Sequence, residues 1–107
     1  FYLDTTTLTW VQPKVTGTEP SARVSTTGCL VDSKIYYFGG YDGVHWMNDV
    51  HVFDIDTNHW EKVQTSDFKP RPRCRHTSNI VKGQLYVFGG NDCELSFNDI
   101  WMLFIGV

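Results

Sequence analysis

Four cationic side chains alternate along one short, proline-containing segment of a chain that is otherwise acidic. They are Lys69, Arg71, Arg73 and Arg75, separated by Pro70, Pro72 and Cys74 and followed by His76. In an extended conformation the four cations would share one face, whereas a polyproline-like conformation would spread them around the chain. Two interpretations follow. The segment is a solvated connection with Arg73 paired inside the fold, or Arg71 and Arg75 bind carboxylates of an acidic partner peptide bidentately.

A second candidate site is the segment Asp54-x-Asp56-x-Asn58, which has the alternating oxygen ligands that begin a calcium loop. Such a loop also needs a glycine and a bidentate glutamate, but His59 and Thr65 occupy those two positions. The sequence therefore favours a turn between strands, in which Asp and Asn side chains satisfy backbone amides. We predict no calcium site there.

The histidines and cysteines offer little for catalysis. The four histidines match no zinc signature, and no two cysteines form a C-x-x-C pair. We expect His76 to hydrogen-bond between strands, by its place beside Arg73. Cys74 lies two residues before His76, yet the segment supplies no third group and no oxyanion donor for a nucleophilic pair. We predict no catalytic residue, no metal site and no cofactor.

The composition is that of a globular chain with a small negative charge. Hydrophobic residues make up 41% of the 107 positions, aromatic residues 15%, and the formal net charge is −3. An acidic chain lacks the basic surface that nucleic acids and anionic membranes require, and no apolar run approaches the ~20 residues of a membrane span. Three cysteines without a pairing pattern favour a reducing compartment. We expect a protein, peptide or small-molecule partner in the cytoplasm, with the nucleus as an alternative.

A block of sequence returns after fifty residues without an insertion or deletion. Residues 34–40 align with 84–90, both containing Tyr-x-Phe-Gly-Gly, and residues 48–50 align with 98–100. The same offset places Asp4, Thr7 and Trp10 over Asp54, Thr57 and Trp60, and fifteen aligned pairs are identical in all. A period near fifty, made of short strand-like segments, is typical of a repeated β unit such as a propeller blade.

The repeat predicts where the strands lie. We expect strands at 25–32, 34–39, 49–54 and 59–64, with copies at 76–82, 84–89 and 99–104. Residues 1–15 would form the end of one blade, residues 23–65 a full blade, and residues 73–107 most of the next. Trp10 and Trp60 recur where an outer strand would cover the gap to its neighbour, so we expect both to be buried between units.

The motifs of these repeats resemble those of the kelch repeat. They are Arg73 and His76 before the first strand, Tyr86-Val87-Phe88-Gly89-Gly90 on the second, Asn98-Asp99-Ile100 opening the third, and the segment from Asp54 to Trp60 leading to the fourth. The resemblance covers essentially the whole chain. It implies an all-β fold of four-stranded antiparallel blades, here about two blades' worth of a larger β-propeller. One departure is Ser25-Thr26, which stands where the second unit has Arg75-His76.

The resemblance also implies where a ligand would bind. In kelch propellers the loops entering the first strand, and those joining the second strand to the third, line the ligand face. The latter are residues 41–48 and 91–98 here. Trp46 has Ser96 at its repeat position, so repeat packing does not explain it, and exposed aromatics are frequent binding anchors. The predicted partner-binding residues are Tyr41, His45, Trp46, Arg71 and Arg75.

The function implied is that of a non-catalytic protein-interaction module or scaffold, with a substrate-recognition part of an adaptor as one version. Two alternatives stay open: a kelch-like propeller enzyme of the metal-dependent oxidase, specifier or epimerase type, and a self-assembling two-blade structural protein. Two blades cannot close a ring or bury both flanking faces. We therefore expect the remaining blades in the same, longer polypeptide, or in other copies of a homo-oligomer.

Overall fold

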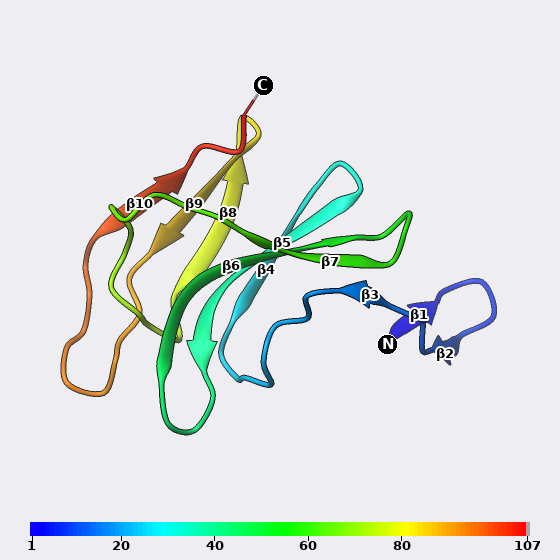
Figure 1. The fold of residues 1–107 in the computed structure, drawn as a ribbon, viewed down its shortest axis with the longest axis horizontal. Coiled ribbons are helices and arrows are strands. Elements are labelled where there is room, and N and C mark those ends of the chain that lie inside the picture. The colour runs from blue at the N-terminus through cyan, green and yellow to red at the C-terminus, as the bar shows by residue number, and fades with distance from the viewer. Residues whose placement is uncertain (107) are drawn as a thin grey trace.

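The chain consists of strands and connecting loops, as shown by the computed structural model, which describes residues 1–106 (Figure 1). The strands are β1 (Tyr2–Asp4), β2 (Thr9–Val11), β3 (Thr16–Gly17), β4 (Thr27–Val31), β5 (Lys34–Tyr41), β6 (Trp46–Asp54), β7 (His59–Val63), β8 (Thr77–Val81), β9 (Gln84–Phe88) and β10 (Ile100–Leu103). Within residues 1–106 there is no helix with the length and apolarity needed to cross a membrane. The predicted all-β fold class is confirmed.

The largest sheet, which we call the central blade, has the strand order β3-β7-β6-β5-β4. Strands β4 to β7 form an antiparallel meander, in which each strand pairs with the next one in the sequence. A bulge between Phe38 and Gly40 interrupts the β5–β6 ladder, which then resumes and ends at the pair Tyr41 and Trp46. The hairpin therefore extends further than the sequence predicts, because pairing continues beyond the glycine pair.

Strand β3 adds a fifth, parallel strand to this blade, which the sequence did not predict. Thr16 N donates to Asn58 O at 3.1 Å, and Thr18 N donates to Trp60 O at 3.0 Å. Gly17 has a φ of +89°, and a Cβ on it would lie 1.9 Å from Trp60 O, so no larger residue fits this approach. The addition covers the backbone groups that the outer edge of β7 would otherwise expose.

A second sheet, the C-terminal blade, has the order β10-β9-β8 and repeats the pairing of the central blade. Thr77 pairs with Phe88 as Thr27 pairs with Phe38, fifty residues earlier. The predicted strands at 76–82, 84–89 and 99–104 are thereby confirmed to within two residues at each end. Strands β1 and β2 form a separate hairpin within residues 1–15, the part of the chain where the sequence predicts the end of one blade.

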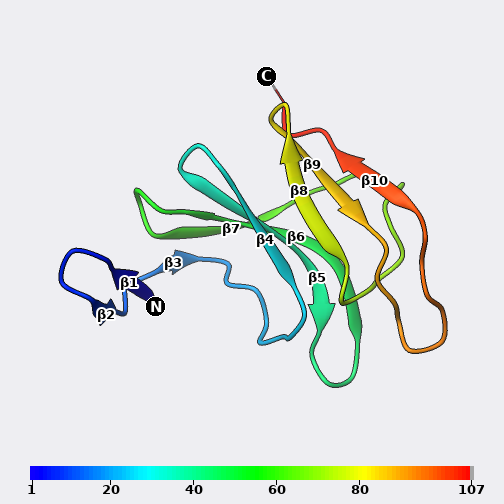
Figure 2. The same ribbon diagram turned by 180° about the vertical axis from the view of Figure 1, so that it is seen from behind.

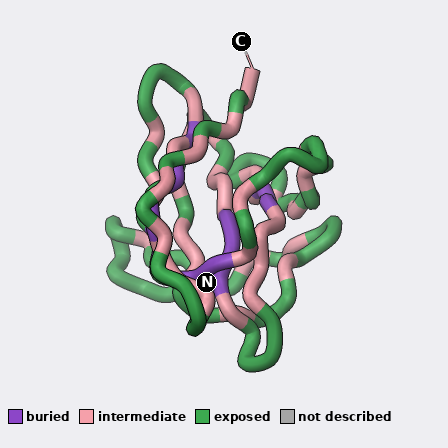
Figure 3. The backbone as a smooth tube through the Cα atoms, turned by 90° about the vertical axis from the view of Figure 1, so that its left-hand side faces the viewer, coloured by how far each residue is buried: buried purple, intermediate pink, exposed green. Residues whose placement is uncertain are grey.

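The core lies where the two blades face each other. Phe38 and Val50 of the central blade cluster with Leu85 and Val87 of the C-terminal blade, and all four are buried. Strands β4 and β8 lie side by side at this junction, as opposite views of the chain show (Figures 1 and 2). Buried stretches lie in the inner parts of strands and in the segment just before β8, whereas the loops at the ends of the hairpins are mostly exposed (Figure 3). Burying one large apolar side chain contributes about 1.5–3 kcal/mol, so these four residues hold the blades together.

The two tryptophans expected between units do not behave alike. Trp60 packs within its own blade, with ring centroids 5.4 Å from Tyr37 and 4.8 Å from Phe53. Trp10 is 71% exposed, because its hairpin pairs only with itself. The prediction that both are buried between units is wrong for Trp10 in the part of the chain that the structure describes.

Loops of both blades gather at one end of the molecule. The β5–β6 loop, the β9–β10 loop and the segments that lead into β4 and β8 all lie at the lower end of Figure 1 and of the reverse view (Figure 2). We call this end the loop face. The β4–β5 and β8–β9 turns lie at the opposite end of their strands, where Lys82 and Gly83 both have the positive φ that tight hairpins favour.

Candidate functional site

An arginine and an aspartate form the same two-pronged ion pair in both blades. Arg23 Nη1 lies 2.6 Å from Asp49 Oδ1, and Arg23 Nη2 lies 3.1 Å from Asp49 Oδ2. Arg73 makes the equivalent contacts with Asp99, at 2.6 and 3.0 Å. Each arginine comes from the segment before the first strand of its blade, so the pair fixes that segment to the third strand. We call this repeated contact the Arg–Asp clasp.

The arginine of the C-terminal clasp is more deeply buried than that of the central clasp, although Asp99 is more exposed than Asp49. Arg73 has 0% exposure, donates to Gly89 O at 2.9 Å, and holds its guanidinium carbon 4.1 Å from the centroid of the Phe97 ring. The hydrogen bonds from Arg73 lower the pKa of Asp99 to about 2. Arg73 is therefore paired inside the fold, as the first interpretation of the basic segment expected. The four cations of that segment do not share one face.

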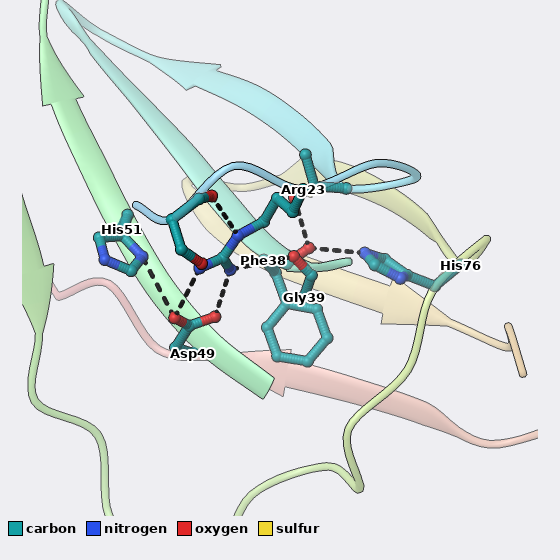
Figure 4. A network of polar contacts seen from close by, with 8 residues as sticks. Arg23, Phe38, Gly39, Asp49, His51 and His76 are labelled. Carbon is teal, nitrogen blue, oxygen red and sulfur yellow. Dashed lines mark hydrogen bonds and ion pairs between the residues drawn. The ribbon is translucent and has the colours of Figure 1, made fainter. Parts of the chain in front are cut away.

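A third side chain contacts the aspartate of each clasp, and it differs between the blades. In the central blade, Nδ1 of the buried His51 lies 3.6 Å from Asp49 Oδ2 (Figure 4). In the C-terminal blade, Trp101 Nε1 donates to Asp99 Oδ2 at 2.9 Å. Burial lowers the pKa of His51 despite the opposing charge of Asp49, so this imidazole is neutral near pH 7. His51 and Trp101 thus occupy the same repeat position and contact equivalent carboxylates with different chemistry.

His76 joins the two blades. Its Nε2 lies 2.9 Å from Phe38 O, and its ring meets the Phe38 ring edge-on with centroids 5.1 Å apart (Figure 4). This confirms the prediction that His76 hydrogen-bonds between strands, here between two sheets. His76 is buried, and burial lowers its pKa. Its Nδ1 has no hydrogen-bond partner among the described residues.

Backbone hydrogen bonds continue this junction, which we call the interblade seam. The bonds run from Gly40 N to Arg73 O (2.9 Å), from Arg73 N to Met47 O (3.0 Å) and from Arg75 N to Ser25 O (3.3 Å). Gly39 has a φ of +69°, and a Cβ on it would lie 2.9 Å from Arg73 O. Its lack of a side chain lets the two blades approach closely at the loop face.

Tyr41 and Trp46 form an aromatic pair at the neck of the β5–β6 loop. They pair directly across the hairpin, and their ring centroids are 4.3 Å apart with the planes tilted by 31°. Both are only partly buried. Asp42 shapes the loop by accepting hydrogen bonds from the backbone N–H groups of Val44 (2.8 Å) and His45 (2.6 Å). The His45 side chain is 75% exposed at the tip.

The equivalent neck in the C-terminal blade is polar. Asn91 and Ser96 pair across the β9–β10 loop where the central blade has its aromatic pair. Asp92 accepts hydrogen bonds from the backbone N–H groups of Glu94 (3.1 Å) and Leu95 (2.8 Å), as Asp42 does in its own loop. The two loops therefore share a backbone design and differ in the side chains that they present.

Arg71 lies against the C-terminal loop. Its Nη2 is 3.7 Å from Asp92 Oδ2, and its guanidinium carbon is 5.8 Å from the centroid of the Phe97 ring. The backbone N–H of Leu95 and the charge of Arg71 lower the pKa of Asp92. The Arg71 side chain is nevertheless 63% exposed, which leaves donors of its guanidinium open to solvent.

Arg75 lies on the interblade seam in a left-handed backbone conformation. Its φ is 59°, and Ser25, its repeat partner, has a φ of 57°. Arg75 is exposed, and its guanidinium forms no ion pair with any residue in the range 1–106. Of the three arginines in the basic segment, it is the one whose guanidinium is exposed and has no acidic partner among residues 1–106; Lys69 is likewise exposed and without an ion pair there.

All five predicted partner-binding residues lie on the segments that form the loop face (Figures 1 and 2). Tyr41 and Trp46 are in contact. His45 is at the tip of the β5–β6 loop, Arg71 lies in the segment before β8 against the β9–β10 loop, and Arg75 lies on the seam. Whether they contact a partner stays a prediction.

Sequence reasoning missed the aspartates of the clasp. Both are identical between the repeats, and each follows its arginine by 26 residues. Paired opposite charges that recur with the same separation were the signal that could have identified the clasp. Val24 was also missed, although it is 63% exposed and pairs with Tyr41.

The groups considered for catalysis or metal binding have other partners. Asp54 Oδ1 accepts from the backbone N–H groups of Asp56 (2.9 Å) and Thr57 (3.4 Å), which confirms its role in a turn. Cys74 Sγ lies 3.8 Å from Asn91 Oδ1, while His76 binds the Phe38 carbonyl. Over residues 1–106, no group of three or more His, Cys, Asp or Glu side chains is placed to hold a metal ion.

Comparison with known proteins agrees with this architecture. The family model described as the KLHDC2/KLHL20/DRC7 Kelch-repeats domain matches residues 1–106. Kelch domain-containing protein 3 of Bos taurus is 36% identical over 59 residues, which is 53% of this chain and 15% of that protein. Kelch domain-containing protein 2 of Bos taurus is 42% identical over 55 residues, and Kelch domain-containing protein 1 of Homo sapiens 40% over 55 residues. The matched region is 14% of each of these two relatives.

Proposed function

Because this chain belongs to the kelch-repeat family, whose domains generally mediate protein–protein binding, we propose that it binds a peptide or protein partner without catalysing a reaction. The binding surface is the loop face, and the contacts come from Tyr41, His45, Trp46, Arg71 and Arg75. The remaining blades of the propeller come from a longer polypeptide or from other copies of the chain.

One observation carries this proposal. Tyr41 and Trp46 occupy a pair of positions at which the next repeat has Asn91 and Ser96, on the same hairpin backbone. Since the polar pair supports the same hairpin neck, the aromatic pair is not required to build the loop. Partly exposed Tyr and Trp side chains are the commonest anchors of binding hot spots, because they bring a large contact area with little conformational freedom to lose.

The charges of the loop face favour an acidic partner. Arg75 forms no ion pair among the described residues. Arg71 forms one ion pair, with Asp92, and its side chain stays largely exposed. Guanidinium groups bind carboxylates through paired hydrogen bonds. In a longer protein, such a module would act as a scaffold or as the substrate-recognition part of an adaptor, in the cytoplasm or the nucleus.

The test exchanges side chains between the two loops. We would probe an array of acidic, neutral and basic peptides with the labelled chain and with the double variant Tyr41→Asn, Trp46→Ser, which gives the central loop the neck of the C-terminal loop. We expect a set of peptides whose binding weakens about tenfold or more in the variant, as for a hot spot. The matched control is Ile55→Ser, an exposed position in the β6–β7 turn.

The proposal fails if the chain binds no peptide, or if the double variant binds as the original chain does. Circular dichroism and the urea unfolding midpoint of both variants distinguish a lost contact from a lost fold. The reverse exchange, Asn91→Tyr with Ser96→Trp, tests whether an aromatic neck is sufficient to strengthen binding at the second loop.

A further inference from the structure

An apolar lane and a cation meet at the interblade seam. Val24 pairs with Tyr41 through backbone hydrogen bonds of 2.8 and 2.9 Å, and Tyr41 pairs with Trp46 on the next strand. These three residues therefore lie side by side in the order Val24, Tyr41, Trp46. Val24 is 63% exposed and the other two are partly exposed, so the lane presents a continuous apolar surface at the loop face.

The corresponding lane of the C-terminal blade has a different chemistry. Cys74 pairs with Asn91 through bonds of 2.9 Å in each direction, and Asn91 pairs with Ser96. Cys74 is buried where Val24 is exposed. A ligand that spans both blades would therefore contact an apolar surface on the central blade and a polar surface on the C-terminal blade.

Arg75 lies at the boundary between the two lanes. Its backbone N–H donates to the carbonyl of Ser25, the residue that follows Val24, so Arg75 and the apolar lane are neighbours across one hydrogen bond. The left-handed backbone of Arg75 is shared by Ser25, which shows that the conformation belongs to the position and not to the arginine side chain.

We propose that this boundary selects an extended peptide segment in which an apolar side chain and an Asp or Glu side chain are two residues apart. The inference rests on the proposed function and narrows it to a partner chemistry. In an extended peptide, residues i and i+2 point to the same side, about 7 Å apart. That spacing places the apolar side chain on Val24, Tyr41 and Trp46 while the carboxylate reaches the guanidinium of Arg75.

Arg75 rather than Arg71 sets the position of the acidic residue. The Arg71 guanidinium keeps exposed donors, but the Asp92 carboxylate beside it offsets part of its charge, so Arg71 attracts a partner carboxylate less strongly than Arg75 does. Arg73 is closed within its clasp. The charge left to recognise a ligand carboxylate next to the apolar lane is therefore that of Arg75.

The experiment is selection from a phage-displayed library of random dodecapeptides against the original chain, against Arg75→Ser and against Lys34→Ser. Serine is the residue at the equivalent left-handed position 25, so Arg75→Ser keeps the backbone compatible with the fold. Lys34→Ser removes the same charge at the exposed start of β5, at the other end of that strand from Tyr41.

We expect peptides selected on the original chain and on Lys34→Ser to contain an apolar residue two positions from Asp or Glu. On Arg75→Ser the apolar residue should remain, and the acidic residue should fall to its frequency in the library. For a synthetic peptide of the selected sequence, changing its acidic residue to the amide should weaken binding about tenfold on the original chain and hardly at all on Arg75→Ser.

Two outcomes would overturn the inference in distinguishable ways. If peptides are selected and lose binding to the Tyr41→Asn, Trp46→Ser variant, but keep their acidic residue on Arg75→Ser, the loop face binds peptides and the role given to Arg75 is wrong. If no peptide is selected on any chain, the proposed function fails and this inference fails with it. An unchanged urea midpoint for Arg75→Ser ensures that the comparison concerns binding.

Discussion

The two blades share an ion pair and a loop backbone but present different side chains at the loop face. Both have an Arg–Asp clasp with nearly the same distances, and both shape their loops with an aspartate that accepts two backbone N–H groups. At the loop necks one blade has Tyr41 and Trp46, while the other has Asn91 and Ser96. The residues that are identical in both repeats stabilise the blade, whereas the residues at the loop necks differ and can contact different ligands.

The largest effect should come from the buried clasp. Replacing Arg73 by alanine removes a fully buried guanidinium and leaves Asp99 without its partner, so the free energy of unfolding should fall by about 3 kcal/mol. Arg23→Ala should cost less, because the Arg23 side chain is less deeply buried than that of Arg73. Urea unfolding followed by circular dichroism measures both changes.

Arg71→Ala is the matched control for that comparison, because Arg71 lies two residues from Arg73 and is exposed. Its change in the free energy of unfolding should stay within about 0.5 kcal/mol. Equal losses for Arg71→Ala and Arg73→Ala would mean that the clasp contributes no more than an ordinary surface pair.

A smaller effect should come from the parallel strand that only the central blade has. Gly17→Ala places a Cβ against Trp60 O, so β3 should separate from β7 with a loss of about 1 kcal/mol. Gly43→Ala is the control, because Gly43 also has a positive φ but has nothing within 4 Å of an added Cβ. Hydrogen exchange at the N–H groups of Thr16 and Thr18 should accelerate in Gly17→Ala and stay unchanged in Gly43→Ala.

The smallest effect concerns the histidine that distinguishes the two clasps. Burial lowers the pKa of His51 and of His76 below the value of an unfolded chain, so the unfolded state binds more protons. Stability should therefore decrease as the pH falls below about 6.5 and level off below the folded pKa values. His51→Trp, which copies Trp101, should reduce this slope, and thermal unfolding at several pH values measures it.

The acidic range offers a check on that assignment. Hydrogen bonds from Arg73 lower the pKa of Asp99 to about 2, so its contribution is lost only as the pH falls below about 4. His51→Trp should leave this lower transition in place. A variant whose stability near pH 6 varies as steeply as that of the original chain would show that His51 does not govern the upper range.

Much of the fold followed from the sequence because the signals were local and occurred twice. Tyr-x-Phe-Gly-Gly marks a strand that ends in a sharp turn, and its recurrence after fifty residues fixed the strands of both blades. Strand β3 has only two residues and no alternation of apolar and polar residues, so it is recognisable only from its pairing with β7. The exposure of Trp10 also depends on tertiary pairing, which no local pattern encodes.

The candidate site was less accessible to sequence reasoning, for a physical reason. The alternation of Lys69, Arg71, Arg73 and Arg75 describes their spacing but not their partners. Arg73 turns inward because Asp99, which is distant in sequence, completes its clasp, and Arg75 leaves the extended conformation for a left-handed one. Side-chain direction in that segment is decided by contacts between blades, whereas the aromatic character of Trp46 could be noticed by comparison with Ser96 alone.

The left-handed position shared by Ser25 and Arg75 has an evolutionary consequence. Its backbone is held by the strands on either side, and it carries a small hydroxyl in one repeat and a long cation in the next. Substitutions between residues that tolerate the left-handed conformation can therefore change the side chain presented there while the backbone of the seam keeps its shape. A repeat protein with such a position in each unit can acquire new specificities by single substitutions, and a protein engineer could vary the same positions together.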